Sequence, residues 1–205
     1  TVTNVHSSGD LAAQSNVGGL LGNGVYANIA DSSSSGYVSA SGHTAGGLVG
    51  LGSHARIVHS QARGTVQGPN NIGGFIGQAW HQVIENDYSE ATVSGDERVG
   101  GFIGYTIYGQ LKDSESRATV TGNRSIGGFA GLLENTTLTG IHTQATVSGE
   151  EEFIGGIAGY AISVHLERFT SNAVVTGSQS VSGAIGYAEL TSISNGLITG
   201  AIESQ

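Results

Sequence analysis

A glycine-rich segment of six residues recurs along the whole of this 205-residue chain. Its clearest copy, residues 72–77, reads Ile-Gly-Gly-Phe-Ile-Gly, and related hexads occupy 17–22, 45–50, 99–104, 126–131, 154–159 and 181–186. Successive hexads begin 28, 27, 27, 27, 28 and 27 residues apart. A period this regular is typical of stacked copies of one supersecondary unit. The sequence therefore predicts one solenoid domain over residues 1–205.

The segments between the hexads predict β-strands. Their apolar runs are short, rich in Val, Ile, Phe and Thr, and interrupted by Gly, and none sustains a helical pattern. Within residues 91–95, Ala-Thr-Val-Ser-Gly, the alternation points Val inward and both Thr and Ser outward.

Aligning the repeats gives three apolar columns. They are Val66, Val93, Val120, Val147 and Val175; Leu48, Phe75, Phe102, Phe129 and Ile157; and Ile57, Ile84, Leu111, Leu138 and Leu166. Three columns from three strands per turn predict an all-β fold, a parallel β-solenoid (β-helix) of about seven rungs of 27–28 residues. We expect a roughly triangular cross-section, and the crossover rule favours a right-handed coil.

The doubled glycine, such as Gly73 and Gly74, is expected at a corner of the coil. There a Cβ would clash with the next rung, about 4.8 Å away, or would require a positive φ. Both ends of the chain stop partway through a rung, and no capping helix is evident, although a solenoid needs its edges covered. We therefore expect a slice of a longer protein, with flanking repeats or domains, or end-to-end association.

Composition narrows the classes of partner. A net charge of −9 argues against nucleic acid. The chain has no Cys, and no carboxylate stands at ligand spacing from His54 and His81, so we expect no metal site and no cofactor. No helix follows the Gly-Gly-x-x-Gly segments, which argues against a nucleotide-binding loop. The apolar stretches are too short to span a bilayer.

The Gly-Gly-Leu-Leu-Gly, Gly-Gly-Leu-Val-Gly and Gly-Gly-Phe-Ile-Gly copies, followed by Ala-Thr-Val-Ser-Gly, resemble the GLUG repeat over nearly the whole chain. That family occurs in large bacterial surface and secreted proteins, including adhesins and the non-catalytic parts of IgA-specific metallopeptidases. The resemblance implies an exported β-solenoid, extracellular or on the bacterial cell surface, with a stalk, adhesion or scaffold role. It implies no catalytic residues, because the repeat is defined by its core and turns.

The variable segment after each hexad is where a function would be added to the repeat. One offset there carries Tyr26, His54, His81 and Tyr108, with Trp80 beside His81, and a second offset carries Tyr105, Tyr160 and Tyr187. Flat rings along a rigid edge suit a glycan or a partner protein, although a ladder that only packs on itself explains the same pattern. The favoured function is therefore non-catalytic adhesion, with Tyr26, His54, Trp80, His81, Tyr105 and Tyr108 as ligand-binding residues.

An alternative function is a β-helix lyase acting on acidic polysaccharide. Tyr88 and His142 share an offset with Glu115, and Lys112 and Arg117 lie on the same segment. Tyr or His would act as acid and base while the cations neutralise a uronate carboxylate. A solvated face of paired charges is the favoured explanation of these residues, because each appears once and no motif fixes their geometry.

A second alternative is ice binding through an outward Thr-x-Ser/Thr array. Its members are Thr92 and Ser94, Thr119 and Thr121, and Thr146 and Ser148. Regular threonine pairs on a flat face can order water, but the row breaks at Gln67 and Val174, and Thr also favours strands.

Overall fold

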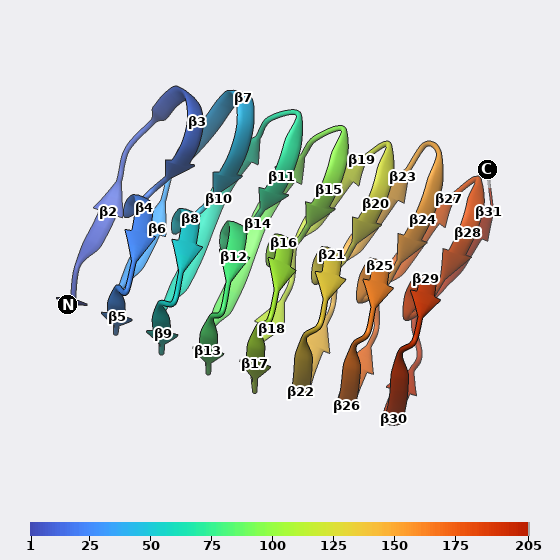
Figure 1. The fold of residues 1–205 in the computed structure, drawn as a ribbon. Helices are drawn as coiled ribbons and strands as arrows, with labels where there is room; N and C mark the ends of the chain where they lie inside the picture. The colour runs from blue at the N-terminus through green and yellow to red at the C-terminus, as the bar shows by residue number, and fades with distance from the viewer. Residues whose placement is uncertain (205) are drawn as a thin grey trace.

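The computed structural model describes residues 1–204 and confirms an all-β, parallel β-solenoid of about seven rungs, with no helix among those residues. The rungs lie one after another in chain order, from the N terminus (blue) to the C terminus (red) in Figure 1. Each rung hydrogen-bonds to the rung before it and the rung after it, and its strands divide between two sheets.

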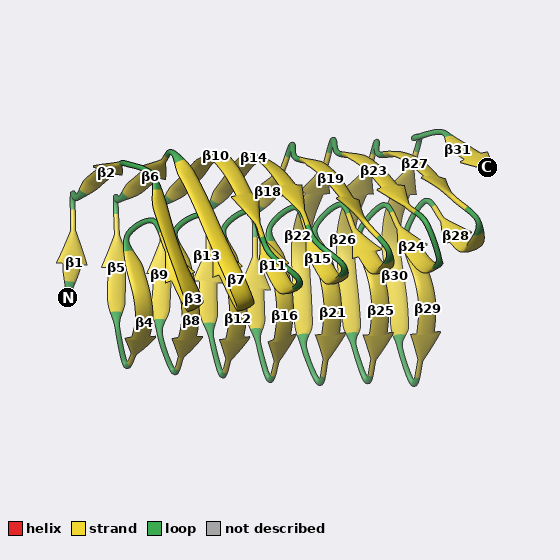
Figure 2. Ribbon diagram, turned by 90° about the horizontal axis from the view of Figure 1, so that it is seen from above, coloured by secondary structure: helices red, strands yellow, loops and turns green. Residues whose placement is uncertain are grey.

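The smaller sheet contains one five-residue strand from each rung, and Figure 2 shows these strands aligned along one side of the molecule. Its members are β4 (Leu21–Val25), β8 (Val49–Ser53), β12 (Ile76–Trp80), β16 (Ile103–Ile107), β21 (Ala130–Glu134), β25 (Ala158–Ile162) and β29 (Ile185–Glu189).

The larger sheet wraps around the rest of each rung. The strands that follow the smaller sheet are β1 (Val2–Thr3), β5 (Asn28–Ala30), β9 (Arg56–Val58), β13 (Val83–Glu85), β17 (Gln110–Lys112), β22 (Thr137–Thr143), β26 (His165–Ser171) and β30 (Ser192–Ile198). Next come β2 (His6–Ser8), β6 (Ser33–Ser35), β10 (Gln61–Gln67), β14 (Tyr88–Ser94), β18 (Glu115–Ser116), β19 (Thr119–Gly122), β23 (Thr146–Gly149), β27 (Val174–Gly177) and β31 (Ile202–Ser204). The strands that lead into the hexads are β3 (Leu11–Gly18), β7 (Tyr37–Gly46), β11 (Asn70–Gly73), β15 (Glu97–Gly100), β20 (Arg124–Gly127), β24 (Glu152–Gly155) and β28 (Gln179–Ser182).

The three predicted columns form the core. Val66 pairs with Val93 and Ile57 with Ile84 in the next rung, and both columns continue in register along the solenoid. The rings of Phe75, Phe102 and Phe129 stack with centroids 4.5 and 4.6 Å apart, and all three are fully buried. Stacking of like side chains on like is what an exact repeat in register produces.

Each rung turns at three columns of residues with left-handed φ, between 45° and 71°. The first corner, after the smaller sheet, contains Tyr26, His54, His81, Tyr108, Asn135, Ser163 and Leu190. The second corner contains Asn4, Asp31, His59, Asn86, Asp113, Gly140, Arg168 and Asn195. The third corner, just before each hexad, contains Asn16, Thr44, Asn71, Arg98, Ser125, Phe153 and Ser180. All of these residues except Gly140 have side chains.

The doubled glycines are required for one of the two reasons expected. The chain bends at Gly74 and Phe75, and neither Gly73 nor Gly74 has a positive φ, but a Cβ on Gly74 would overlap the Gly101 carbonyl oxygen of the next rung. Each rung also narrows here to a waist, where the opposite strand supplies a hydroxyl: Ser116 Oγ donates a 2.6 Å hydrogen bond to the Gly128 carbonyl. A Cβ on Gly101 would overlap that carbonyl and lie 2.5 Å from Ser116 Oγ. The waist separates the core into two apolar clusters.

All variation in rung length occurs near the third corner. From each hexad to the next column valine or its equivalent, for example from Ile72 to Val93, the chain always advances by 21 residues. From that valine to the following hexad the advance is 6 residues, as from Val66 to Ile72, but 7 from Val38 to Ala45 and from Val147 to Ile154. The pairing of β3 with β7 shifts register at this point. Two rungs therefore carry one extra residue, at Ser41–Gly42 and at Glu150–Glu151.

The last rung is open on one side. Ile193, Leu197, Ile198 and Ile202 occupy β30 and β31, and all are exposed. No helix long and apolar enough to cross a membrane occurs among residues 1–204.

Candidate functional site

Four rings form a continuous row along the first corner, as predicted. Tyr26 stacks on His54 with ring centroids 5.0 Å apart, and His54 stacks on His81 at 4.8 Å. His81 stacks on Tyr108 at 4.8 Å, and the angles between neighbouring rings are 16° to 29°. We call these four residues the ring row.

The backbone beneath the ring row is strained. Each of its residues has φ between 51° and 57°, a region in which side chains other than Asn and Asp are uncommon. The next rungs place Asn135 and Ser163 at the same corner. The row is also open to solvent, since Tyr26 is 72% and Tyr108 is 50% exposed. Burial in the core does not favour rings here, and left-handed residues occur at all three corners of the coil, so exposure and stacking are what distinguish the ring row.

The ring row presents edges rather than faces. Because the rings are stacked nearly parallel, each internal ring has both faces covered by its neighbours. Only the two end rings, Tyr26 and Tyr108, have a face with no ring stacked on it among residues 1–204, and Asn135 follows Tyr108 at the same corner. A ligand lying along the row therefore meets tyrosine hydroxyls and imidazole nitrogens, repeated about once per strand spacing of 4.8 Å.

An open depression of about 450 Å³ lies beside the ring row, over the outer face of the smaller sheet. It brings together His54, Trp80, His81, Tyr105 and Tyr108, while Tyr26 lies beyond its end. Trp80 is 40% exposed and supplies the one indole. Ile107 adds an apolar side chain to the lining, and Gln78 adds an amide.

Tyr105 is already engaged within the protein. Its hydroxyl donates a 3.0 Å hydrogen bond to Glu134 Oε2, and Arg98 lies 6.0 Å from the centre of its ring. Burial and this hydrogen bond to a carboxylate raise the pKa of Tyr105 to about 12. Tyr105 therefore forms a fixed wall of the depression, and Trp80 is the freer side chain.

Tyr105, Tyr160 and Tyr187 share one column, as predicted, but Leu132 separates the first from the other two. Tyr160 stacks on Tyr187 at 4.6 Å, and Phe153 packs against both rings, at 5.2 and 5.3 Å. The repeat alignment missed Phe153, because it belongs to the third corner, whose residue type changes from rung to rung.

The residues of the lyase alternative do not converge on one cavity. Tyr88, Glu115 and His142 do form one column. However, Lys112 lies 3.0 Å from Glu85, and Arg117 lies 2.7 Å from Glu115. Lys112 and His142 line separate depressions.

Tyr88 is held between two arginines, Arg63 at 5.9 Å and Arg117 at 5.5 Å from its ring centre. Burial and Glu90 raise the pKa of Tyr88, which is unfavourable for a catalytic base. The face is thus a network of paired charges over this stretch of the solenoid.

The outward threonines align as expected. Thr65, Thr92, Thr119 and Thr146 form one row, and Val174 interrupts it. The adjacent row contains Gln67, Ser94, Thr121 and Ser148.

Two polar groups are buried where the sequence gives no sign of them. Asp87 is 2% exposed, and it accepts hydrogen bonds from the backbone N–H of Ser60 at 2.6 Å and of Glu85 at 3.1 Å. Burial raises the pKa of Asp87 to about 8. Gln82, which follows His81 of the ring row, has no hydrogen-bond partner for either amide atom among the residues that the structure describes. Within residues 1–204, no three His, Asp or Glu side chains are grouped so as to hold a metal ion.

No protein-family model matches this sequence, and no curated protein matches it either.

Proposed function

We propose that this chain is a non-catalytic binding and adhesion solenoid of an exported bacterial protein, located outside the cell or on the bacterial surface. It binds a glycan, or a protein of a neighbouring or host cell, along the ring row and the adjoining depression. The observation that carries this proposal is the run of four exposed, stacked rings at a strained corner.

The ring row has the physical properties of a recognition surface. It is rigid, because each corner residue is fixed by backbone hydrogen bonds to the next rung, such as His54 N–H to the Trp80 carbonyl at 2.8 Å. A pre-organised surface loses little conformational entropy on binding. Tyr and Trp combine apolar area with hydrogen-bonding groups, which suits both sugars and proteins.

Two further points support binding over catalysis. The cations of the lyase alternative are paired with carboxylates at 2.7 to 3.0 Å. The resemblance to GLUG repeats favours an exported adhesion or scaffold role.

The test uses substitutions that other rungs already tolerate. Tyr108→Asn and His81→Asn copy Asn135 of the same corner, and Trp80→Ser copies Ser53 of the same strand column. The triple variant should keep its melting temperature, because Asn accepts a left-handed φ better than Tyr or His. We expect it to lose at least about tenfold in affinity for the glycans that the parent binds on an array, and in binding to whole cells.

The matched control is Leu190→Asn, which changes an exposed residue of the same corner beyond the ring row. This variant should bind like the parent. Retention of full binding by the triple variant, or no binding of the parent to any glycan or cell surface, refutes the proposal.

A further inference from the structure

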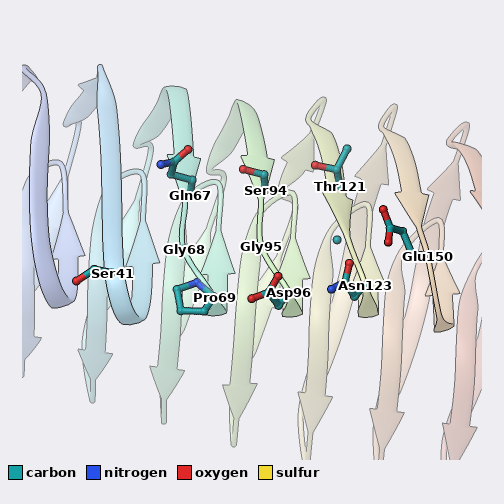
Figure 3. Close-up of a pocket in the computed structure, with 11 residues that line it drawn as sticks. Ser41, Gln67, Gly68, Pro69, Ser94, Gly95, Asp96, Thr121, Asn123 and Glu150 are labelled. Atoms are coloured by element: carbon teal, nitrogen blue, oxygen red, sulfur yellow. The ribbon is translucent and has the colours of Figure 1, made fainter.

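A polar groove of about 490 Å³ runs across several rungs near the third corner, on a different face from the ring row. In Figure 3, Gln67, Ser94 and Thr121 lie along one side and Pro69, Asp96 and Asn123 along the other. The backbone of Gly68 and Gly95 lies between the two rows. A Cβ at Gly95 would lie 2.7 Å from the Gly68 carbonyl oxygen, so the floor stays free of side chains.

Extra residues stand at both ends of the groove. In the three rungs that form its floor the chain advances by 6 residues from the column valine to the hexad, whereas in the rungs on either side it advances by 7. The additional residue falls at Ser41–Gly42 on one side and at Glu150–Glu151 on the other, and Ser41 and Glu150 line the groove. The groove is therefore a bounded site about four rung steps long, or about 19 Å.

Most of the polar side chains in the groove are free to bind a ligand, and the exception is Gln67, which donates a 3.3 Å hydrogen bond to Ser39 Oγ. The side chains of Ser94, Thr121 and Asn123 make no hydrogen bond within residues 1–204, and Asp96 and Glu150 form no ion pair there. The nearby arginines are both neutralised, Arg98 by Glu97 at 3.4 Å and Arg124 by Glu152 at 2.7 Å.

The lining indicates the chemistry of the ligand. It contains hydroxyl, amide and carboxylate groups, no aromatic side chain and no cation. Peptides are recognised through a free strand edge or apolar pockets, and the strands beneath this groove are paired on both sides. An oligosaccharide, whose hydroxyl groups both donate and accept hydrogen bonds, suits such a surface better than a peptide. Asp96 and Glu150 belong to rungs two steps apart, a rise of about 9.6 Å along the solenoid axis, and attract positive charge while repelling uronate or sulfate.

We propose that this groove is a second binding site, independent of the ring row, for an oligosaccharide that carries amino groups. The sugar chain lies along the solenoid axis, where one 1,4-linked sugar residue advances by nearly one rung. Ser94, Thr121 and Asn123 bind its hydroxyls, and Asp96 and Glu150 bind ammonium groups on alternate residues.

The test is calorimetric titration of the 205-residue chain at mildly acidic pH, where sugar amines are protonated. The probes are a β-1,4-linked glucosamine oligomer, its N-acetylated counterpart, a uronate oligomer and an oligolysine of equal charge. We expect the glucosamine oligomer to bind most tightly and the uronate oligomer not to bind. The Asp96→Asn/Glu150→Gln variant should weaken glucosamine binding by at least about tenfold.

A matched charge variant separates this site from general charge attraction. Asp10→Asn/Glu189→Gln makes the same charge change outside the groove and should leave binding unchanged. Oligolysine binding as tightly as the sugar, equal loss in both charge variants, or no binding of the glucosamine oligomer overturns the proposal.

Discussion

At the scale of single residues, the corners depend on a backbone conformation that most side chains avoid. Thr44 and Phe153 adopt φ values of 60° and 64° at the third corner. A β-branched residue in this region is normally an outlier. The repeat alignment could not find the third corner, because its residue type changes from rung to rung. Hydrogen bonds between rungs fix the conformation, and that cause is tertiary.

Asp87 is the residue whose chemistry fits its position least well. The same column contains Ser60 and Ser114, whose hydroxyls donate to the carbonyls of Val58 and Lys112. Asp87 has its carboxyl in that buried row, with a pKa raised to about 8 from a usual value of about 3.9. Between these two pKa values the folded state keeps a proton on Asp87 that the unfolded state has lost. The free energy of unfolding therefore falls as pH rises from the lower value to the higher one.

Asp87→Ser should remove this pH dependence. Relative to the parent, the variant should gain up to about 1.4 kcal/mol of unfolding free energy per pH unit between pH 4 and 8, and no more above that. Urea denaturation across this range measures the difference. Asp96→Ser, which removes an exposed carboxylate, is the control. Parallel curves for parent and Asp87→Ser would show that Asp87 is ionised in the fold.

At the scale of elements, the hexad joins the two apolar clusters through the waist. Ile72 belongs to one cluster and both Phe75 and Ile76 to the other, so the two glycines between them cross the narrowest part of the rung. The column positions followed directly from the sequence, because a constant period places equivalent residues above one another. The hydroxyl opposite the glycines did not, since Ser89 and Ser116 precede their glycine partners by 12 residues in a variable segment.

Gly101→Ala should destabilise the protein by about 3 kcal/mol or more, because the added methyl overlaps backbone that cannot move without disturbing two rungs. Gly9→Ala is the matched control. No atom lies within 4 Å of a Cβ at Gly9, and we expect a change within about 0.5 kcal/mol. Chemical denaturation of both variants measures these effects, and similar midpoints would contradict the role assigned to the waist.

Sequence reasoning predicted the candidate sites in part. The ring row followed from a shared offset, since equal offsets must stack. The orientation of its rings did not, because it depends on side-chain rotamers at a left-handed backbone. Lys112 looked available for catalysis because its partner Glu85 is 27 residues away in the sequence and only the folded registry brings them close. Arg117 pairs with Glu115, which is near it in the sequence, so the alternation of a strand could have suggested that contact.

At the scale of the whole molecule, the solenoid tolerates a change of length at one place only. A serine inserted after Asp96 should preserve the fold, because two natural rungs carry an extra residue there. A serine inserted after Ala91 should reverse the inward and outward alternation of β14, expose Val93 and abolish cooperative unfolding. Circular dichroism and thermal melts compare the two. Equal tolerance of both insertions would refute the assignment of a fixed 21-residue segment.

The rung-by-rung stacking also sets how far such a chain can reach. Twenty-seven residues in an unfolded tether would extend to about 90 Å, whereas the same residues here add about 4.8 Å to the length of the molecule. In return, whatever is attached at the far end stands at a fixed distance and a fixed rotation. A gene that gains or loses repeats would therefore shift an attached domain in small, equal steps along the solenoid axis.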